Sequence, residues 1–299
     1  MRASDPSRIT VHLLSCDIPD STYRDWHDEI VSHLPQSATI IRHTISMTEF
    51  DSFGSWHSSK SAYARLKLEG ILSDVKWCVY CDVDTLFVDD PLKLLTLFDP
   101  TKVIIGHEDK LEADQVHVTW LKSKGMLNGD SYVCSGFMLM NLEEFRKENI
   151  GSKCIDFIAT NPDVKYPDQD ALNMYCRGRV GYTPEGWGIF SWEAFKYGKP
   201  SCIHYVADLP WKIMTSQYLD FNDPQWLWFD CAKKLYGWRV RDVAIGYSFW
   251  PFIRRLMIGF ICRTFARFIW AIGIANPGRI TSYLLKHYAP AYVWRELAR

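Results

Sequence analysis

The chain has 299 residues, of which 47% are hydrophobic and 23% are charged, a balance that excludes wholesale disorder and permits a large buried core. The net charge of −1 conceals an asymmetry, because residues 248–299 contain eight basic residues and one acidic residue. This basic end predicts contact with a polyanionic surface, either membrane phosphate or nucleic acid.

The first third of the chain alternates apolar runs with amphipathic segments. Strands are expected at residues 9–14, 39–44, 77–82 and 102–106, and helices at residues 21–34, 61–72 and 91–98. The run at 77–82 is almost continuously apolar, which is typical of a strand buried in a parallel sheet. The alternation predicts an α/β sheet covered by helices on both faces.

The pattern after residue 106 is α+β. Strands are expected at residues 132–140 and 202–206, and helices at residues 142–147, 168–176, 222–237 and 248–270. We expect one main domain over residues 1–246 and a basic amphipathic helical tail over residues 247–299.

Nine cysteines, an odd number, favour a reducing compartment. The close pair Cys78 and Cys81 lies in a predicted strand, where positions i and i+3 face opposite sides, so we expect neither a zinc nor a redox motif. The polar first ten residues predict no signal peptide. Arg263 and Arg267 interrupt the most apolar segment, residues 256–275, so no membrane span is expected.

Two aspartates follow the strand predicted at residues 77–82. Asp82 and Asp84, at i and i+2, project to the same side at the carboxyl end of a strand, where α/β sheets usually bind ligands. Their like charges repel unless a cation lies between them, so the pair predicts a divalent metal site. The alternative is an exposed acidic turn, which is our interpretation of the nearby Asp89 and Asp90.

Two further segments add candidate polar groups. Asp168 precedes a predicted helix, and capping of that helix is the simplest interpretation of the acidic stretch at residues 168–173 taken alone. His204 lies on a predicted strand, where a lone histidine is usually structural. As a third ligand beside Asp82 and Asp84, it would complete an oxygen and imidazole set that suits Mn²⁺ or Mg²⁺ better than zinc or copper.

Five blocks, in order along residues 10–215, resemble glycosyltransferase family 8, which includes bacterial lipopolysaccharide galactosyl- and glucosyltransferases and glycogenin. The blocks are Tyr-Ala-Arg-Leu at 63–66, Asp-Val-Asp at 82–84, Cys-Ser-Gly-Phe-Met-Leu-Met-Asn-Leu at 134–142, Asp-Gln-Asp-Ala-Leu-Asn at 168–173, and the segment 204–211 that ends in Pro-Trp. The resemblance implies a GT-A fold, a Rossmann-like mixed α/β sheet flanked by helices. It also implies transfer of a hexose, galactose or glucose, from a UDP-sugar to a saccharide acceptor such as lipopolysaccharide or another surface glycan, with retention of anomeric configuration.

The same resemblance implies roles for the metal and the diphosphate. Asp82, Asp84 and His204 match the family's metal ligands, with Mn²⁺ or Mg²⁺ as the cofactor. Val83, between the two aspartates, would belong to the donor-binding site. Arg65 matches a residue that faces the donor sugar and its diphosphate.

Further matches concern the sugar itself. Ser135 and Gly136 match contacts to the donor sugar, and His57 matches a residue that lines the acceptor cleft. Asp168 and Gln169 match residues that hold the donor hydroxyls near the reacting carbon. We expect Gln169 to position the donor and stabilise an oxocarbenium-like state without forming a covalent intermediate.

The chain departs from the family pattern at three places. Cys134 stands where the family usually has asparagine, and Ala207 and Leu209 stand where it has glycine and lysine. That lysine normally contacts the diphosphate, so Lys212 is the candidate to replace it in donor binding. No segment matches the family's first strand and helix, and we expect that about 20 to 25 family residues are missing before residue 1.

The expected tail helix combines aromatic and aliphatic residues with four arginines, Arg254, Arg255, Arg263 and Arg267. Such a helix is typical of a membrane interface, and related lipopolysaccharide transferases carry a similar tail. We therefore expect a cytoplasmic protein bound peripherally to the inner face of the membrane, near a lipid-linked saccharide acceptor. The alternative is a helix that packs on the main domain with its arginines reaching into solvent.

Other functions stay open at this point. The Asp-Val-Asp-Thr sequence after an apolar strand is similar to a haloacid-dehalogenase-type phosphatase motif, but that motif needs threonine one position later than Thr85 and leaves His204 unexplained. A catalytically inactive glycosyltransferase-like protein that binds a partner or a membrane is the alternative outside enzymes. Nucleic-acid binding is the weakest option, because the tail is more apolar than a phosphate-tracking surface needs.

Overall fold

The computed structural model describes residues 3–271 except 33–34, 36, 55–59, 112–114, 127–130, 197–199, 207–208 and 216–223. The chain divides into two compact units, Met1–Gly188 and Ile189–Arg299. The domain boundary expected near residue 246 stays a prediction.

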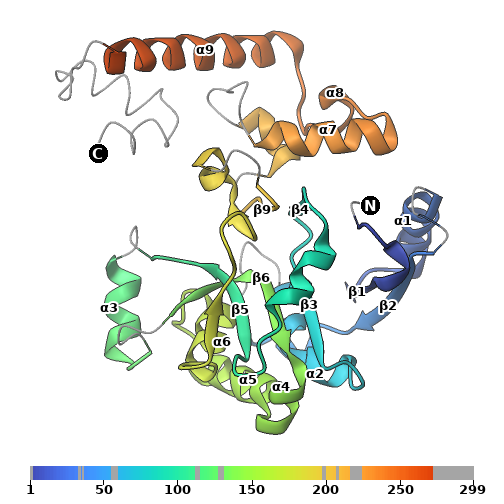
Figure 1. Cartoon of the computed structure of the whole chain (residues 1–299), viewed down its shortest axis with the longest axis vertical. Coiled ribbons are helices and arrows are strands. Elements are labelled where there is room, and N and C mark those ends of the chain that lie inside the picture. The colour runs from blue at the N-terminus through green and yellow to red at the C-terminus, as the bar shows by residue number, and fades with distance from the viewer. Residues whose placement is uncertain are drawn as a thin grey trace. The chain divides into compact units, whose positions relative to one another are not determined.

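The first unit has the expected mixed α/β architecture (Figure 1). Its main sheet contains four strands in the order β3 (Trp77–Cys81), β6 (Val133–Asn141), β5 (Ile104–Glu108) and β7 (Val180–Tyr182). β6 runs antiparallel to β3 and β5, whereas β7 is parallel to β5. The strand expected at 77–82 is therefore present, but its expected burial in a parallel sheet is wrong, because β3 is antiparallel to β6 and only half-buried. A continuous apolar run does not determine the direction of the neighbouring strand.

A second, two-stranded sheet precedes the main sheet along the chain. It pairs β1 (Thr10–Cys16) in parallel with β2 (Thr39–Ile45), and α1 (Asp20–Ser32) provides the crossover that parallel strands require. These three elements confirm the predicted strand–helix–strand order. The short strand β4 (Thr85–Phe87) follows the aspartate pair.

Two segments expected as helices are wholly or partly 3₁₀ helices. Residues 61–72 form the 3₁₀ helix Ser61–Lys67 followed by α2 (Leu68–Ile71), and residues 91–98 contain the 3₁₀ helix Pro91–Leu97. Residues 63–66 are all buried, so surrounding contacts and not an amphipathic pattern set the conformation of the first segment. Asp90 caps the second, since its Oδ1 accepts from Leu92 N at 3.0 Å.

The helices after β6 lie together beside the main sheet (Figure 1). They are α4 (Leu142–Glu148), α5 (Ile150–Thr160) and α6 (Pro167–Tyr175). α3 (Gln115–Ser123) packs against two of them, because His117 contacts Asp170 of α6 and Leu121 belongs to a cluster that Phe157 of α5 packs against. β6 is buried at all nine positions, and its last residue, Asn141, caps α4 by accepting from Glu144 N at 3.3 Å. This covered strand forms the centre of the first unit's core and carries the third sequence block.

The part of the second unit that the structure describes is mostly helical. β8 (Ile189–Phe190) pairs in parallel with β9 (Cys202–His204), and α7 (Gln225–Tyr236), α8 (Val240–Val243) and α9 (Phe249–Ala271) follow. Phe252 and Leu256 of α9 pack against a small core that includes Ile213 and Phe229. Among the residues that the structure describes, no helix combines the length and apolar character that crossing a bilayer requires.

Candidate active site

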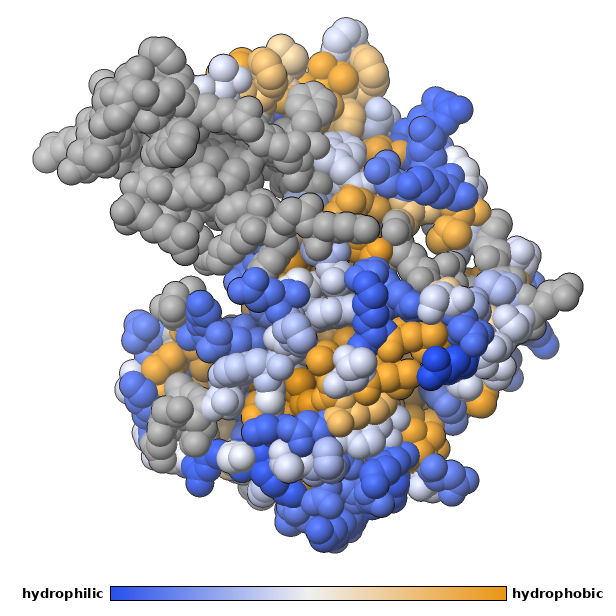
Figure 2. All heavy atoms as spheres, viewed as in Figure 1, coloured by the Kyte–Doolittle hydropathy of each residue, from blue (hydrophilic) through white to orange (hydrophobic). Residues whose placement is uncertain are grey.

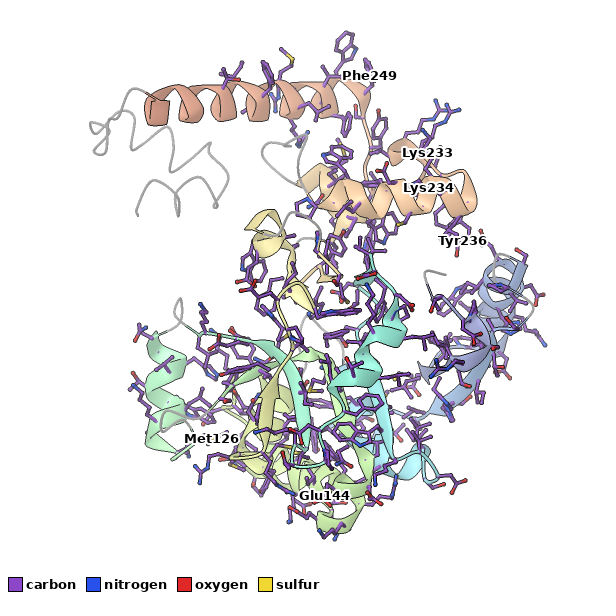
Figure 3. The ribbon with its side chains drawn as sticks, viewed as in Figure 1. Met126, Glu144, Lys233, Lys234, Tyr236 and Phe249 are labelled. Atoms are coloured by element: carbon purple, nitrogen blue, oxygen red, sulfur yellow. The ribbon has the colours of Figure 1, made fainter. Side chains whose placement is uncertain are left out.

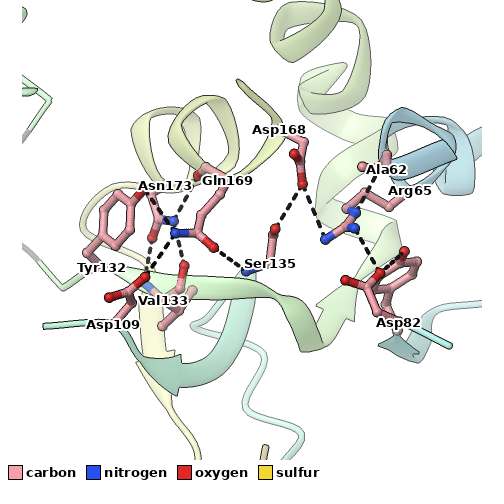
Figure 4. Close-up of polar contacts among 11 residues, drawn as sticks. Ala62, Arg65, Asp82, Asp109, Tyr132, Val133, Ser135, Asp168, Gln169 and Asn173 are labelled. Atoms are coloured by element: carbon pink, nitrogen blue, oxygen red, sulfur yellow. Dashed lines mark hydrogen bonds and ion pairs between the residues drawn. The ribbon is translucent and has the colours of Figure 1, made fainter. Parts of the chain in front are cut away.

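Arg65 occupies the centre of a buried polar cluster (Figure 4). The residue is 3% exposed, and its Nη2 donates to Asp82 Oδ1 at 2.8 Å. Its Nη1 lies 3.2 Å from Asp168 Oδ2, and the guanidinium stacks over the ring of Tyr80 at 4.5 Å. One side chain from the 3₁₀ helix Ser61–Lys67 therefore connects the aspartate after β3 with the aspartate at the start of α6.

The charges around Arg65 reinforce one another. Burial by itself lowers the pKa of the guanidinium, but electrostatic interaction with Asp82, Tyr80 and Asp168 outweighs that effect and raises the pKa. Tyr80 donates its hydroxyl to Asp82 Oδ1 at 2.7 Å, and burial raises the pKa of that phenol well above its ordinary value. One guanidinium between two carboxylates leaves an excess of negative charge, which favours a further cation beside Asp82.

Asp168 serves the cluster and does not cap its helix. Its Oδ2 accepts from Ser135 Oγ at 2.8 Å, whereas Tyr166 occupies the N-cap position of α6 without a side-chain cap. The capping interpretation of Asp168 is therefore wrong, because the carboxylate is turned toward β6 and Arg65.

Gln169 joins α6 to β6. Its Oε1 accepts from the backbone N–H of Ser135 at 3.0 Å, and its Nε2 donates to Asp109 Oδ2 at 3.1 Å and to the hydroxyl of Tyr132 at 3.2 Å (Figure 4). The carbonyl of Gly136 accepts from the backbone N–H of Asp82 at 2.8 Å. β6 thus lies between the two acidic blocks and is hydrogen-bonded to both.

A buried group beside this cluster was missed by the sequence analysis. Asp170 accepts from the Tyr132 hydroxyl at 2.5 Å, and its Oδ1 lies 3.0 Å from His117 Nε2. The sequence predicts only that Asp170 belongs to the acidic first turn of a helix. No sequence pattern identifies Tyr132 or His117 as candidate site residues. The available signal was the spacing of Asp170 and Asn173, which places two polar side chains on one face of a predicted helix.

The aspartate pair lies on either side of an exposed valine. Asp82 follows β3, Asp84 precedes β4, and Val83 between them is 92% exposed. Asp82, Asp84 and His204 form a candidate metal-binding group, in which each residue offers one ligand atom and these atoms lie within 4.8 Å of one another. Two carboxylate oxygens and an imidazole nitrogen fit Mn²⁺ or Mg²⁺.

The remaining predicted positions have mixed outcomes. Asp89 accepts from Asp90 N and pairs with Lys93, so these acidic residues have local roles, although both are half-buried and not exposed as expected. Lys212 is exposed on the 3₁₀ helix Pro210–Thr215, and its role in donor binding stays a prediction. His57 and Ala207 lie outside the described residues.

Sequence comparison places these residues in a family. Residues 2–214 match Glycosyl transferase family 8. A putative glycosyltransferase of Haemophilus influenzae is 34% identical over 125 residues, which is 42% of this chain and 37% of that protein. General stress protein A of Bacillus subtilis is 33% identical over 152 residues, which is 49% of this chain and 51% of that protein. The chain thus spans between about a third and a half of the length of these curated relatives.

Structure comparison gives the same fold. A galactosyltransferase, LgtC, in complex with donor and acceptor sugar analogues, superposes with a TM-score of 0.62 at 22% identity, covering 77% of this chain and 86% of LgtC. GlyE, a glycosyltransferase of Streptococcus pneumoniae, superposes with a TM-score of 0.50 at 19% identity, covering 68% of this chain and 49% of GlyE. The GT-A fold is therefore confirmed. Since the family match also covers well over half of the sequence, the chain belongs to glycosyl transferase family 8.

Proposed function

We propose that the protein transfers a hexose, galactose or glucose, from a UDP-sugar to a saccharide acceptor with retention of anomeric configuration. The supporting observation is the buried cluster in which residues from four separate blocks of the sequence contact one another: Arg65, Asp82, Ser135, Asp168 and Gln169. These are the positions at which the family resemblance expects the donor.

The residues of the cluster would act mainly by positioning and electrostatics. Asp168 would accept hydrogen bonds from hydroxyl groups of the UDP-sugar, and Ser135 would donate a hydrogen bond to one of them. Gln169 would lie near the reacting carbon. Arg65 would orient the Asp82 and Asp168 carboxylates, because it already contacts both. Val83, Gly136 and Lys212 would complete the donor site, and His57 would line the acceptor cleft.

Asp82, Asp84 and His204 would hold Mn²⁺ or Mg²⁺. When bound, such an ion acts as a Lewis acid on the diphosphate and stabilises the charge of the departing UDP. Arg65 would orient the Asp82 carboxylate for this role, since its Nη2 donates to Asp82 Oδ1.

We further propose that the acceptor is a lipid-linked saccharide, lipopolysaccharide or another surface glycan, and that α9 binds the cytoplasmic face of the inner membrane. Apolar side chains of α9 lie at the surface (Figure 2), and one of them is Phe249, which Figure 3 labels. Trp250 and Phe260 are also exposed, Trp250 by 76%. Arg254 is exposed on the same helix. Exposed aromatic residues beside arginine suit an anionic membrane interface, and no nucleic-acid partner is proposed.

The deciding experiment incubates the protein with Mn²⁺, a saccharide acceptor and a panel of UDP-sugars, and measures released UDP. Asp84→Ala should abolish release, because it removes one carboxylate from the candidate metal group. Asp74→Ala, which changes an exposed aspartate before β3, should release UDP at the wild-type rate. Unchanged release in Asp84→Ala would show that the metal assignment is wrong.

The same assay separates the alternatives. UDP binding without turnover for any sugar would favour an inactive glycosyltransferase-like binding protein. Hydrolysis of a generic phosphoester, with no use of UDP-sugars, would favour a haloacid-dehalogenase-type phosphatase.

A further inference from the structure

One contact determines which atom of the Gln169 side-chain amide donates hydrogen bonds and which atom accepts them. The backbone N–H of Ser135 can only donate, and it lies 3.0 Å from Gln169 Oε1. This contact fixes the carbonyl oxygen of the amide against β6 and turns the NH2 group the other way. Nε2 then donates to Asp109 Oδ2 at 3.1 Å and to the Tyr132 oxygen at 3.2 Å (Figure 4).

Tyr132 continues this chain of donors. Its oxygen accepts from Gln169, so its single proton goes to Asp170 Oδ1, 2.5 Å away. Burial, together with the charge of Asp170, raises the pKa of Tyr132 well above its ordinary value and keeps the phenol protonated. Asp170 is itself fully buried and is held by His117 Nε2 at 3.0 Å and by the N–H of Tyr166 at 3.2 Å.

An amide NH2 group has two N–H donors, and the protein uses both of those in Gln169. The second lone pair of the carbonyl oxygen is what the side chain still offers to a ligand. We infer that Tyr132 and Asp170 are positioning residues, which fix the Gln169 amide so that only its carbonyl oxygen is available to a ligand. The hydrogen-bond network stands by itself, whereas its kinetic consequence rests on the proposed transferase function.

The opposite orientation of the amide is disfavoured at both ends. A flipped Gln169 would set its NH2 group against the N–H of Ser135 and its oxygen against the carboxylate of Asp109, so that donor meets donor and acceptor meets acceptor. In the observed orientation the oxygen can accept from a sugar hydroxyl and place partial negative charge beside an electron-poor reacting carbon. It cannot donate a hydrogen bond to the departing diphosphate.

The direct test observes the Gln169 side-chain amide by NMR in the full-length protein, with Gln169→Leu used to assign its resonances. Both N–H protons should exchange slowly with solvent. Tyr132→Phe keeps the ring, which packs with Leu121 and Met126, and should speed the exchange of one proton by about five- to tenfold. Rapid exchange of both protons in the wild type would overturn the inference.

Tyr175→Phe is the matched control for this measurement. Tyr175 is also an aromatic residue on α6, but its hydroxyl makes no hydrogen bond to any residue that the structure describes. Its loss should leave the exchange of both Gln169 protons unchanged. Faster exchange in Tyr175→Phe, equal to that in Tyr132→Phe, would mean that general loosening of α6 and not the phenol of Tyr132 controls the amide.

Kinetics test the positioning role. Tyr132→Phe should lower kcat roughly tenfold or more, with the KM for the donor little changed, because the misplaced amide faces the reacting carbon and not the nucleotide. In a Gln169→Ala background the same substitution should have no further effect, and additive losses would overturn the role. A protein without transferase activity but with a slowly exchanging Gln169 amide would refute the proposed function and support the orientation.

Discussion

Arg65 shows how one side chain can join segments that lie far apart in the sequence. Its guanidinium contacts two carboxylates and an aromatic face, and the three contacts require a planar, extended cation. A lysine at this position would keep the charge but present it at a single point. The geometry of the cluster therefore depends on the shape of the cation as well as on its charge.

Arg65→Lys tests that dependence. We expect the free energy of unfolding to fall by about 2 kcal/mol, since one buried carboxylate contact is left unmade. We also expect kcat/KM for the donor to fall roughly 100-fold, because Asp82 and Asp168 lose their common orienting group. Urea unfolding and initial rates of UDP release measure the two effects.

Arg24→Lys, on the exposed surface of α1, provides the comparison and should leave both quantities unchanged. If Arg65→Lys unfolds at the same urea concentration as the wild type, the planar contacts of Arg65 do not have the proposed importance.

For single residues, the sequence predicts most members of the buried polar cluster around Arg65 but not the contacts between them. The aspartate pair, Arg65 and Gln169 stand in recognisable blocks, so their presence in one site could be expected. Tyr132 and His117 could not be found in this way, because they approach Asp170 across 38 and 53 residues of chain and belong to no local pattern.

Among the elements, the five longest strands and β9 were predicted, whereas the strands β4, β7 and β8 and the helices α3, α5 and α8 were not. β4, β7 and β8 contain three, three and two residues, which is too few for any hydrophobic period to show. α5 was missed because Asn149, with φ of 54°, separates it from α4 by a single left-handed residue. Asparagine tolerates that conformation, so the sequence lacks the glycine that usually marks such a helix end.

The packing of α5 against the 3₁₀ helix Ser61–Lys67 leads to a second prediction. A Cβ atom on Gly151 would lie 2.1 Å from the backbone oxygen of Leu66, next to Arg65. Gly151→Ala should therefore force the two elements apart and lower the free energy of unfolding by about 1 to 3 kcal/mol, with a loss of activity through Arg65. Urea unfolding and UDP release measure the change.

Gly70→Ala is the matched control for this substitution. Gly70 lies in α2, and a Cβ atom there would meet nothing within 4 Å. Alanine should leave the protein as stable as the wild type or more stable by about 0.5 to 1 kcal/mol. Equal behaviour of the two alanine variants would show that the Leu66 contact does not limit the packing.

For the molecule as a whole, the proposed membrane contact can be separated from folding. Truncation after Gly246 would remove Phe252 and Leu256, which pack against the core of the second unit. A triple variant, Trp250→Ser with Phe260→Ser and Ile261→Ser, changes exposed side chains only. Its flotation with phosphatidylglycerol vesicles should fall roughly tenfold or more, because apolar area no longer enters the interface.

Val116→Ser, which changes an 83% exposed valine on α3, should float like the wild type. Flotation of the triple variant at the wild-type level would refute the membrane role of α9. If the wild type floats equally with neutral and with anionic vesicles, the arginines of α9 do not contribute to membrane binding.

The structure of β6 limits which mutations this protein can accept during evolution. One part of the strand supplies Ser135 and Gly136 to the candidate site, its last residue caps α4, and every position between them is covered. Lengthening or shortening the strand by one residue would invert its alternation and detach one of these two functions. A library evolved toward new sugars should therefore tolerate point changes in residues 133–141 but yield no insertions or deletions there.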